Sequence, residues 1–408
     1  MKKLLLLLFL PFGMLAQVSG TVVSETGNQP VPFASVFINN TTLGTTTDEN
    51  GRFSISRVGP GKHELVVSVL GFEKFFTVIS VPLGKPLILP LREKSTQLDA
   101  VTVRAFDKNG WKTWGKLFTE SFIGTTSNAR RTVLKNPGDL RFRHDKQNNI
   151  LEVFAVAPLK IRNKSLGYEL EYHLELFRID FRLNSQVYAG YPYFREHGSV
   201  SRARTRNRED TYNASLLKFM RSLYHNTVQQ DGYNIMKMIE TRNTEKDRVR
   251  ALRDKYTLKE RDDSGRLRAY GLPAYPGDIY TPDSLEYFRK ILSQPDSRFA
   301  LLKDSIPTAQ LVKTDTSGVR KFSFKDYLYV VNTRFKEELL YLEYKREKRA
   351  PAPQTSTLKM VEEEEPIEIQ ESGNYFPPLN LYTGDYWTWS NKISDLLPLD
   401  YKPRSSVP

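Results

Sequence analysis

The stretch of the sequence whose residue types best suit chemistry is 168–176, which reads YELEYHLEL. As a β-strand it would place Glu169, Glu171, His173 and Glu175 on one face, because successive side chains point to opposite sides. Three carboxylates beside an imidazole are suitable ligands for a divalent cation. Such neighbours lie about 7 Å apart, however, and could not all reach one small ion without a second strand. We therefore favour an ordinary solvent-facing strand surface, and we predict neither a metal ion nor another cofactor.

The sequence lacks the motifs of the main catalytic classes. Catalytic zinc takes three protein ligands, but no His-x-x-Glu or His-Glu-x-x-His pattern occurs. A Gly-x-Ser-x-Gly elbow, a phosphate-binding loop and a dinucleotide fingerprint are also absent. The five histidines are scattered, at His63, His144, His173, His197 and His225. We therefore predict a protein that is not an enzyme.

Four arginines alternate in the segment SRARTRNRED, at Arg202, Arg204, Arg206 and Arg208. In an extended chain they would project to one side, and their planar guanidinium groups suit phosphates. The target would be an anionic lipid headgroup, lipopolysaccharide or an acidic partner. The alternative is a solvated, charged loop without a ligand.

An aromatic cluster stands near the C-terminus, within 375–408. Tyr386, Trp387 and Trp389 precede a predicted short helix that bears Ile393, Leu396 and Leu397. The Pro-rich and then acidic residues 350–374 before this cluster read as a disordered linker. The cluster is then either a clasp that folds back onto the preceding domain or a docking segment for another protein.

The N-terminal residues predict export. Residues 1–16 place Lys2 and Lys3 before the apolar run 4–10 and end on the small Ala16. This is the pattern of a signal peptide cleaved after Ala16. The apolar run is shorter than the roughly 20 residues that span a bilayer, so we expect no transmembrane helix.

Composition bears on the compartment and the partner. The 408 residues include no cysteine, which excludes a lipoprotein anchor and disulfides. The formal net charge is +13. For an exported chain this charge indicates contact with anionic lipid, lipopolysaccharide or an acidic protein, and not with nucleic acid. We expect a periplasmic protein, either free or associated with the outer membrane.

Residues 17–104 are predicted to form a small antiparallel β-sandwich of about seven short strands. Apolar side chains recur with a period of two between turn signals such as Asn50-Gly51 and Gly59-Pro60-Gly61. The residues predicted to point inward are Ala34, Val36, Ile38, Phe53, Ile55, Leu65, Val67 and Val69.

The order of these motifs resembles the carboxypeptidase-regulatory-like domain. The resemblance is carried by the opening Gly-x-Val strand, Pro32 before an Ala-Ser-Val strand, the series Gly44-Thr-Thr-Thr-Asp48-x-x-Gly51-x-Phe53, and Gly71-Phe72. It implies a transthyretin-like (prealbumin-like) sandwich with no catalytic residues of its own. Such domains occur beside metallocarboxypeptidases and at the N-termini of TonB-dependent outer-membrane receptors of the Bacteroidota.

Residues 105–349 are predicted to form an α+β domain with an antiparallel sheet. An amphipathic helix is expected from an N-cap at Asp210 to a stop at Gly232, with an apolar stripe at Leu216, Phe219, Met220, Leu223 and Tyr224. Shorter helices are expected at 111–122 and 284–292, and strands at 140–145, 150–156 and 321–331. This region and the C-terminal GDYWTWSNKISDLLPLDYKP resemble the body of exported Bacteroidota proteins that share the same N-terminal domain, which implies a compartment but no activity.

The function class that fits these features is a non-catalytic periplasmic or outer-membrane-associated binding or accessory protein. Its specific form would be a component of an outer-membrane assembly or nutrient-uptake complex. The alternative is an envelope hydrolase or glycan-binding enzyme whose site uses unrecognised carboxylates such as Glu171 and Glu175.

Overall fold

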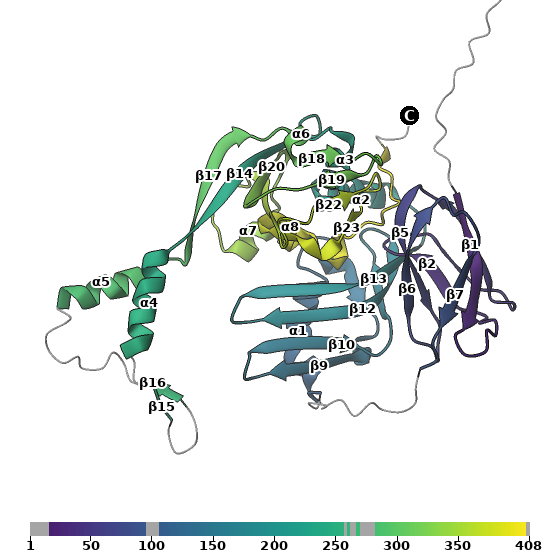
Figure 1. The fold of residues 1–408 in the computed structure, drawn as a ribbon, viewed down its shortest axis with the longest axis horizontal. Helices are drawn as coiled ribbons and strands as arrows, with labels where there is room; N and C mark the ends of the chain where they lie inside the picture. The colour runs from purple at the N-terminus through teal and green to yellow at the C-terminus, as the bar shows by residue number, and fades with distance from the viewer. Residues whose placement is uncertain (1–15, 95–105, 257–258, 262–266, 270–281, 405–408) are drawn as a thin grey trace, which may run out of the picture.

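A computed structural model describes residues 16–94, 106–256, 259–261, 267–269 and 282–404 (Figure 1). The predicted signal peptide lies outside these residues except for Ala16. The division of the chain into domains at 17–104 and 105–349 stays a prediction. The first seven strands form one β unit, and a different arrangement of strands and helices follows them.

The N-terminal part is a β-sandwich, as predicted. One sheet has the order β4-β1-β7 and the other β3-β2-β5-β6. The strands are β1 (Ala16–Ser24), β2 (Ser35–Ile38), β3 (Gly44–Thr46), β4 (Arg52–Val58), β5 (Gly61–Ser68), β6 (Phe75–Val81) and β7 (Leu87–Leu91). The predicted inward residues form its core, with Val69 half-buried. One detail differs from a purely antiparallel sandwich, because β1 and β7 pair in parallel.

A second sheet unit follows the sandwich. The strands are β8 (Thr132–Leu134), β9 (Leu140–Asp145), β10 (Ile150–Ala155), β11 (Leu159–Asn163), β12 (Tyr168–Asp180) and β13 (Ser185–Glu196). Their order is β8-β11-β12-β10-β9, and β13 pairs with β12. Helix α1 (Gly110–Phe122) covers one face, where Phe118 and Phe122 pack against Phe142 and Phe177. The register of the β12–β13 ladder shifts between Leu174 and Leu176, which is the mark of a β-bulge or a similar irregularity.

The rest of the body is built on a five-stranded sheet with the order β17-β14-β20-β21-β24. These strands are β14 (Tyr233–Arg242), β17 (Ser297–Ser305), β20 (Tyr327–Lys336), β21 (Pro353–Met360) and β24 (Leu381–Gly384). A smaller sheet joins β18 (Val312–Thr314), β19 (Arg320–Phe322), β22 (Ile367–Ile369) and β23 (Tyr375–Phe376).

The helices that follow the second sheet unit are α2 (Arg202–Ala214), α3 (Leu216–His225), α4 (Thr244–Tyr256), α5 (Pro282–Ser293), α6 (Thr308–Leu311), α7 (Leu339–Lys345) and α8 (Asp385–Ser390). Short elements complete the described chain: β15 (Lys259–Arg261) with β16 (Leu267–Ala269), and the 3-10 turns η1 (Ala129–Arg131), η2 (Pro137–Asp139), η3 (Pro378–Asn380) and η4 (Ile393–Asp395).

The long amphipathic helix predicted from Asp210 is wrong in its ends. Ser215 has extended backbone angles (φ −84°, ψ 154°) and caps α3, its hydroxyl accepting from the backbone N–H of Lys218. Helix α3 ends at Asn226, which takes the left-handed conformation, rather than at Gly232. A serine cap inside an otherwise helical pattern therefore divides one expected helix into two.

The disordered linker expected at 350–374 is also corrected, because this segment contains β21 and β22. In β21 the side chains of Gln354, Ser356, Leu358 and Met360 are buried at every second position. This period of two is the signature of a half-buried strand, and it outweighs the Pro-rich and acidic composition around it. Similarly, the single strand expected at 321–331 is two strands, β19 and β20.

The sandwich packs directly against the second sheet unit. Phe37 points away from the sandwich core, yet its side chain is fully buried. Its ring stacks on Tyr193 at 4.9 Å and on His173 at 5.4 Å between ring centroids. The outward face of β2 thus acts as an interface with β12 and β13.

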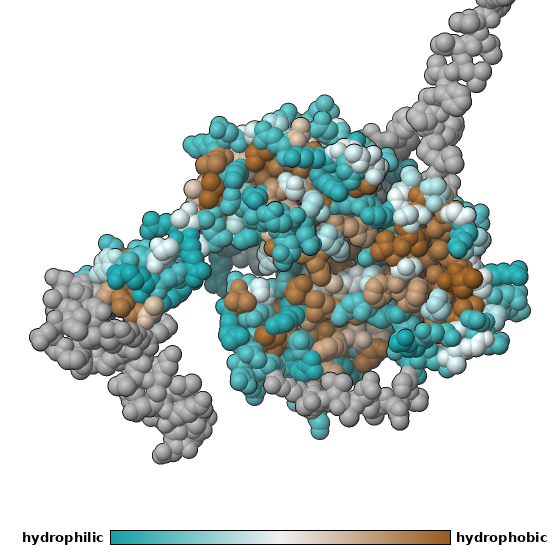
Figure 2. All heavy atoms as spheres, in the orientation of Figure 1, coloured by the Kyte–Doolittle hydropathy of each residue, from teal (hydrophilic) through white to brown (hydrophobic). Residues whose placement is uncertain are grey.

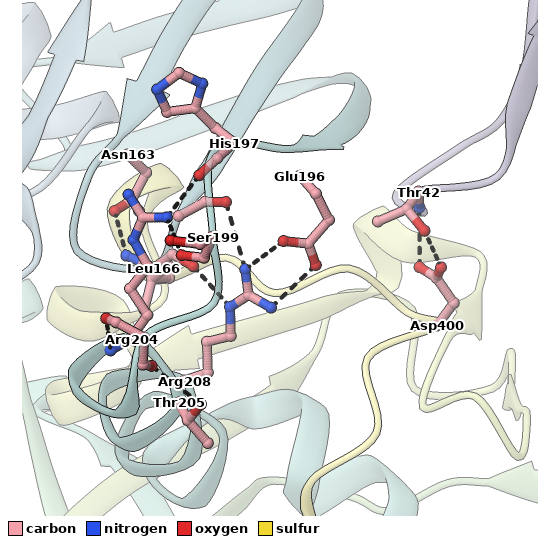
Figure 3. A network of polar contacts seen from close by, with 12 residues as sticks. Thr42, Asn163, Leu166, Glu196, His197, Ser199, Arg204, Thr205, Arg208 and Asp400 are labelled. Atoms are coloured by element: carbon pink, nitrogen blue, oxygen red, sulfur yellow. Dashed lines mark hydrogen bonds and ion pairs between the residues drawn. The ribbon is translucent and has the colours of Figure 1, made fainter.

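Backbone hydrogen bonds fix the same junction. The N–H of Asn40 donates to the carbonyl of Pro192 at 2.8 Å, and the N–H of Phe194 donates to the carbonyl of Thr41 at 3.0 Å. The N–H of Thr42 donates to a carboxylate oxygen of Asp400 at 2.9 Å (Figure 3). The turn after β2 therefore lies between β13 and the C-terminal segment, which holds the sandwich in one orientation.

Candidate functional site

The four alternating arginines lie on helix α2 and not on an extended segment (Figure 3). Arg208 is buried, and its guanidinium donates to both carboxylate oxygens of Glu196, at 3.0 and 2.7 Å, and to the carbonyl of Leu166 at 2.6 Å. The same guanidinium lies 3.9 Å from the ring centroid of Tyr168. Arg208 is thus a structural residue that ties α2 to the sheet.

Arg204 is also used inside the protein. Its Nη1 donates to the carbonyls of His197 and Ser199, each at 2.7 Å (Figure 3). Only Arg202 and Arg206 are exposed. The one-sided arginine row expected for an extended chain is therefore corrected: a helix turns residues two apart to different sides, and two of the four point into the fold.

The charged face of β12 lies at the sandwich junction. Glu169 contacts Arg162 at 2.7 Å, Glu171 contacts Arg195 at 3.1 Å, and Glu175 pairs with Lys74. Each carboxylate thus has its own basic partner. No cluster of three or more potential metal ligands occurs among the described residues.

His173 lies between Phe37 and the charged row. Its Nε2 is 3.6 Å from a carboxylate oxygen of Glu171. The imidazole, followed by Arg195 and Lys160, lowers the pKa of Glu171 against the opposing effect of burial. Glu171 therefore lacks the raised pKa that the hydrolase alternative requires of a general acid.

The aromatic cluster near the C-terminus is buried inside this chain. Tyr386, Trp387 and Trp389 are at most 3% exposed. The indole N–H of Trp387 donates to the carbonyl of Ala214 at 3.0 Å, and that of Trp389 donates to the Thr125 hydroxyl at 2.9 Å. Leu397 is buried and Leu396 half-buried in the core formed by α1 and the second sheet unit. The docking alternative requires exposed side chains and is corrected; the segment has the geometry of the clasp.

A polar pocket lies where the second sheet unit meets the five-stranded sheet. Its volume is about 210 Å³, and its wall is contributed by α2, β20, β21, α8, η4 and the turn before η1. Asn207, Asp210, Thr211 and Ala214 line it from one stripe of α2, with the spacing of neighbours on a helix face. Asp210, expected as a helix cap, is thus a pocket residue.

Two carboxyl groups enter this pocket from separate segments and are held by consecutive residues. Glu338, which precedes α7, accepts from the backbone N–H of Ser127 at 3.4 Å. Asp395 in η4 accepts from the side-chain amide of Asn128 at 2.8 Å. The same amide donates to the Thr211 hydroxyl at 2.9 Å, which connects the acids to α2.

Both carboxyl groups have perturbed acidity. Burial raises the pKa of Asp395 to about 6, although hydrogen bonds from Ser394, Thr126 and Asn128 oppose this shift. Burial also raises the pKa of Glu338. Carboxyls with raised pKa values in a hollow are candidates for a functional site. No pattern in the sequence indicates this pair, because each acid stands alone in a different segment.

A projecting arm is the other conspicuous feature. Strands β14 and β17 extend away from the body and carry α4 and α5 at their far end (Figure 1). Strand β17 is the edge of its sheet and exposes Phe299 (53%), Leu301 (40%) and Leu302 (45%). Figure 2 shows hydrophobic side chains gathered over β17. Among the described residues no helix has the length and apolar character needed to cross a membrane.

Comparison with known proteins identifies the N-terminal domain. Residues 18–103 match the family model of the CarboxypepD_reg-like domain. This agrees with the resemblance in the sequence and with the sandwich. TonB-dependent receptor P39 of Formosa agariphila is 35% identical over 88 residues, which are 22% of this chain and 8% of the receptor. The likeness therefore covers only a small part of each protein.

Solved structures resemble this chain only weakly. A mutant type II cohesin–X-dockerin complex from Acetivibrio cellulolyticus has 24% identity over 19% of this chain and 56% of its own, with a TM-score of 0.17. A protein of unknown function from Bacteroides fragilis aligns over 91% of this chain and 93% of its own, at 9% identity and a TM-score of 0.16. At these TM-scores neither likeness supports an argument.

Proposed function

We propose that the chain is a non-catalytic, periplasmic binding or accessory protein that joins an outer-membrane assembly or uptake complex. The observation that carries the proposal is the projecting arm with its exposed edge strand β17. Its partner would be a protein of the outer membrane. The arm residues Phe299, Leu301 and Leu302 would be the contact surface.

An apolar edge strand that is exposed to solvent is unfavourable in a folded protein. An edge strand presents unpaired backbone N–H and C=O groups and invites pairing with another chain, so natural proteins usually shorten, charge or cover it. In β17 the three apolar residues occupy both faces of the strand, and most of its length is exposed. A partner that adds a strand to this edge would pair those backbone groups and bury the apolar side chains.

The N-terminal domain supports the location and the non-catalytic role. It belongs to a type that also occurs in a TonB-dependent receptor. The contacts of Phe37 with the second sheet unit make this domain a fixed part of the body, which suits a scaffold. Anionic lipid or lipopolysaccharide is less well supported as a partner, because only Arg202 and Arg206 of the arginine series are exposed.

A site-specific cross-link tests the proposal. A photoreactive residue in place of Phe299 should give one predominant cross-linked outer-membrane protein in intact cells of the producing organism. The matched control is Leu183, which is 75% exposed in the turn between β12 and β13 and lies outside the arm. A cross-link pattern that is the same at both positions, or no product at position 299, would count against the proposal.

A further inference from the structure

We propose that the polar pocket between α2, β20 and η4 binds a small hydroxylated primary amine of the amino-sugar class. The inference concerns a different part of the molecule from the arm and does not depend on the arm's partner.

One buried acceptor in the pocket wall lacks a donor. Gln354 is 6% exposed and lines the pocket, and its side-chain carbonyl oxygen has no hydrogen-bond partner. Its amide N–H, by contrast, donates to the carbonyl of Lys336 at 3.0 Å. A buried acceptor without a partner carries a desolvation cost that a donor from a ligand would remove.

The charge balance of the pocket calls for a cation. Asp210, Glu338 and Asp395 line it, against one basic residue, Lys336. No ion pair joins Lys336 to either Glu338 or Asp395 among the described residues. A carboxylate that burial disfavours gains from a positive charge placed beside it, because the attraction is stronger in a poorly solvated site. An ammonium group supplies that charge together with three N–H donors.

The remainder of the wall suits hydroxyl groups. Side chains of Asn207, Thr211, Ser390 and Asn391 line the pocket and can both donate and accept hydrogen bonds. A volume of about 210 Å³ admits a single small molecule rather than a polymer segment. A sugar ring with one amino group matches the size, the charge and the hydrogen-bonding groups together.

The site is also built rather than incidental. Asn128 is 7% exposed and connects Asp395 with Thr211, and Thr126 and Ser394 are fully buried while their hydroxyls contact the same carboxylate. These contacts fix the orientation of Asp395 before any ligand arrives. Preorganised groups lower the entropy cost of binding.

The test is calorimetric titration of the purified chain with glucosamine, glucose and N-acetylglucosamine at pH 7.5. We expect saturable binding of glucosamine and none of the two neutral sugars at equal concentration. Glu338→Gln and Asp395→Asn should each weaken glucosamine binding by about tenfold or more, since each removes a charged hydrogen-bond acceptor. The matched control is Glu343→Gln, an exposed acid on α7, which should leave the affinity unchanged.

Acid should weaken binding in a defined range. As the pH falls through about 6, Asp395 takes up a proton. Burial also raises the pKa of Glu338, so this carboxyl becomes protonated at a higher pH than an ordinary glutamate. The other charged or titratable groups of the wall are Asp210, Lys336 and Tyr386. Affinity for glucosamine should thus fall between pH 7 and pH 5, a range in which most of the ligand is already an ammonium ion. The Asp395→Asn variant should show a smaller fall.

Three results would overturn the inference. An affinity for glucose equal to that for glucosamine would mean that the pocket recognises hydroxyl groups and not the amine. Binding that neither variant changes would place the ligand elsewhere. No saturation of the parent chain at millimolar glucosamine would remove this ligand class. Circular dichroism shows whether both variants are folded, so that their loss of binding can be assigned to the site. Each result leaves the partner proposal unaffected, because the cross-link at position 299 does not involve the pocket.

Discussion

Replacing Asp395 with Asn should make the stability of the protein less dependent on pH. Burial raises the pKa of Asp395 to about 6 in the folded chain, against about 3.9 in an unfolded chain. Between these values the folded state holds the proton more often, so the stability of the parent chain falls as the pH rises. Well above pH 6 the whole contribution of Asp395 to the free energy of unfolding has been lost. The folded and unfolded pKa values differ by about two units, so this loss is about 3 kcal/mol.

The amide can occupy the same position without this penalty. Asn128 donates to one oxygen of Asp395 at 2.8 Å, and an amide oxygen can accept the same bond. The hydroxyls of Thr126 and Ser394 donate to the other oxygen, each at 2.6 Å, and hydroxyls can rotate to accept from an amide N–H. The variant should therefore gain on the parent by about 3 kcal/mol between pH 4 and pH 7.5.

Urea unfolding of both chains across this pH range measures the difference. Glu343→Gln is the control, because this exposed carboxyl should show little change in the difference with pH. The raised pKa of Glu338 affects the stability of both chains, so its effect largely cancels in the difference between their free energies of unfolding. A difference between variant and parent that stays constant from pH 4 to pH 7.5 would refute the reasoning, since Asp395 would then titrate alike in the folded and unfolded chains.

Two further substitutions and one deletion test the packing. Phe37→Ala should lower the free energy of unfolding by about 3 kcal/mol in urea titration, whereas Phe33→Ala, at a ring that is 70% exposed, should change it little. Arg208→Gln should lower the free energy of unfolding by at least about 2 kcal/mol, because it breaks a buried hydrogen bond to Glu196. The control Arg202→Gln, at an exposed side chain, should change this free energy very little. Equal losses in the two variants would contradict the placement of the arginines on α2. Deletion of residues 375–408 removes β24 and the buried aromatics, so the Tm should fall by more than about 10 °C; an unchanged Tm would restore the docking alternative.

The sandwich was predictable because its strands carry local information. Alternating apolar residues such as Val36, Ile38, Leu65 and Val67 define one buried face without reference to the rest of the chain. The same alternation predicts that Phe37 is exposed. Its burial depends on His173 and Tyr193 of the second sheet unit, which are more than a hundred residues away in sequence, so no local pattern could reveal it.

The errors have local physical causes. A serine at position 215 is compatible with a helix by propensity, and only its extended backbone shows that it caps α3. The acidic and Pro-rich composition of 350–374 concealed the alternation of β21. Composition gives the average polarity of a segment. A half-buried strand needs only every second side chain to be apolar or hydrogen-bonded, so its average can still be polar.

The pocket could not be derived from the sequence. Five separate segments contribute Asn128, Asp210, Glu338, Gln354 and Asp395, and no pattern in the sequence relates these residues to one another. What defines their chemistry is mutual proximity and burial, and both arise only when the two sheets meet. The acids that the sequence did suggest, Glu171 and Glu175, are conspicuous because they are close in sequence, yet each is neutralised by a basic neighbour.

Recovery of an outer-membrane partner through the arm tests the central claim most directly. A tagged chain purified from detergent-solubilised native membranes should retain one outer-membrane protein in near-equal amount. The double variant Phe299→Ser, Leu301→Ser should lose it, and Leu183→Ser should keep it. A parent chain that emerges alone at every detergent concentration, or a partner retained equally by the arm variant, would contradict the account.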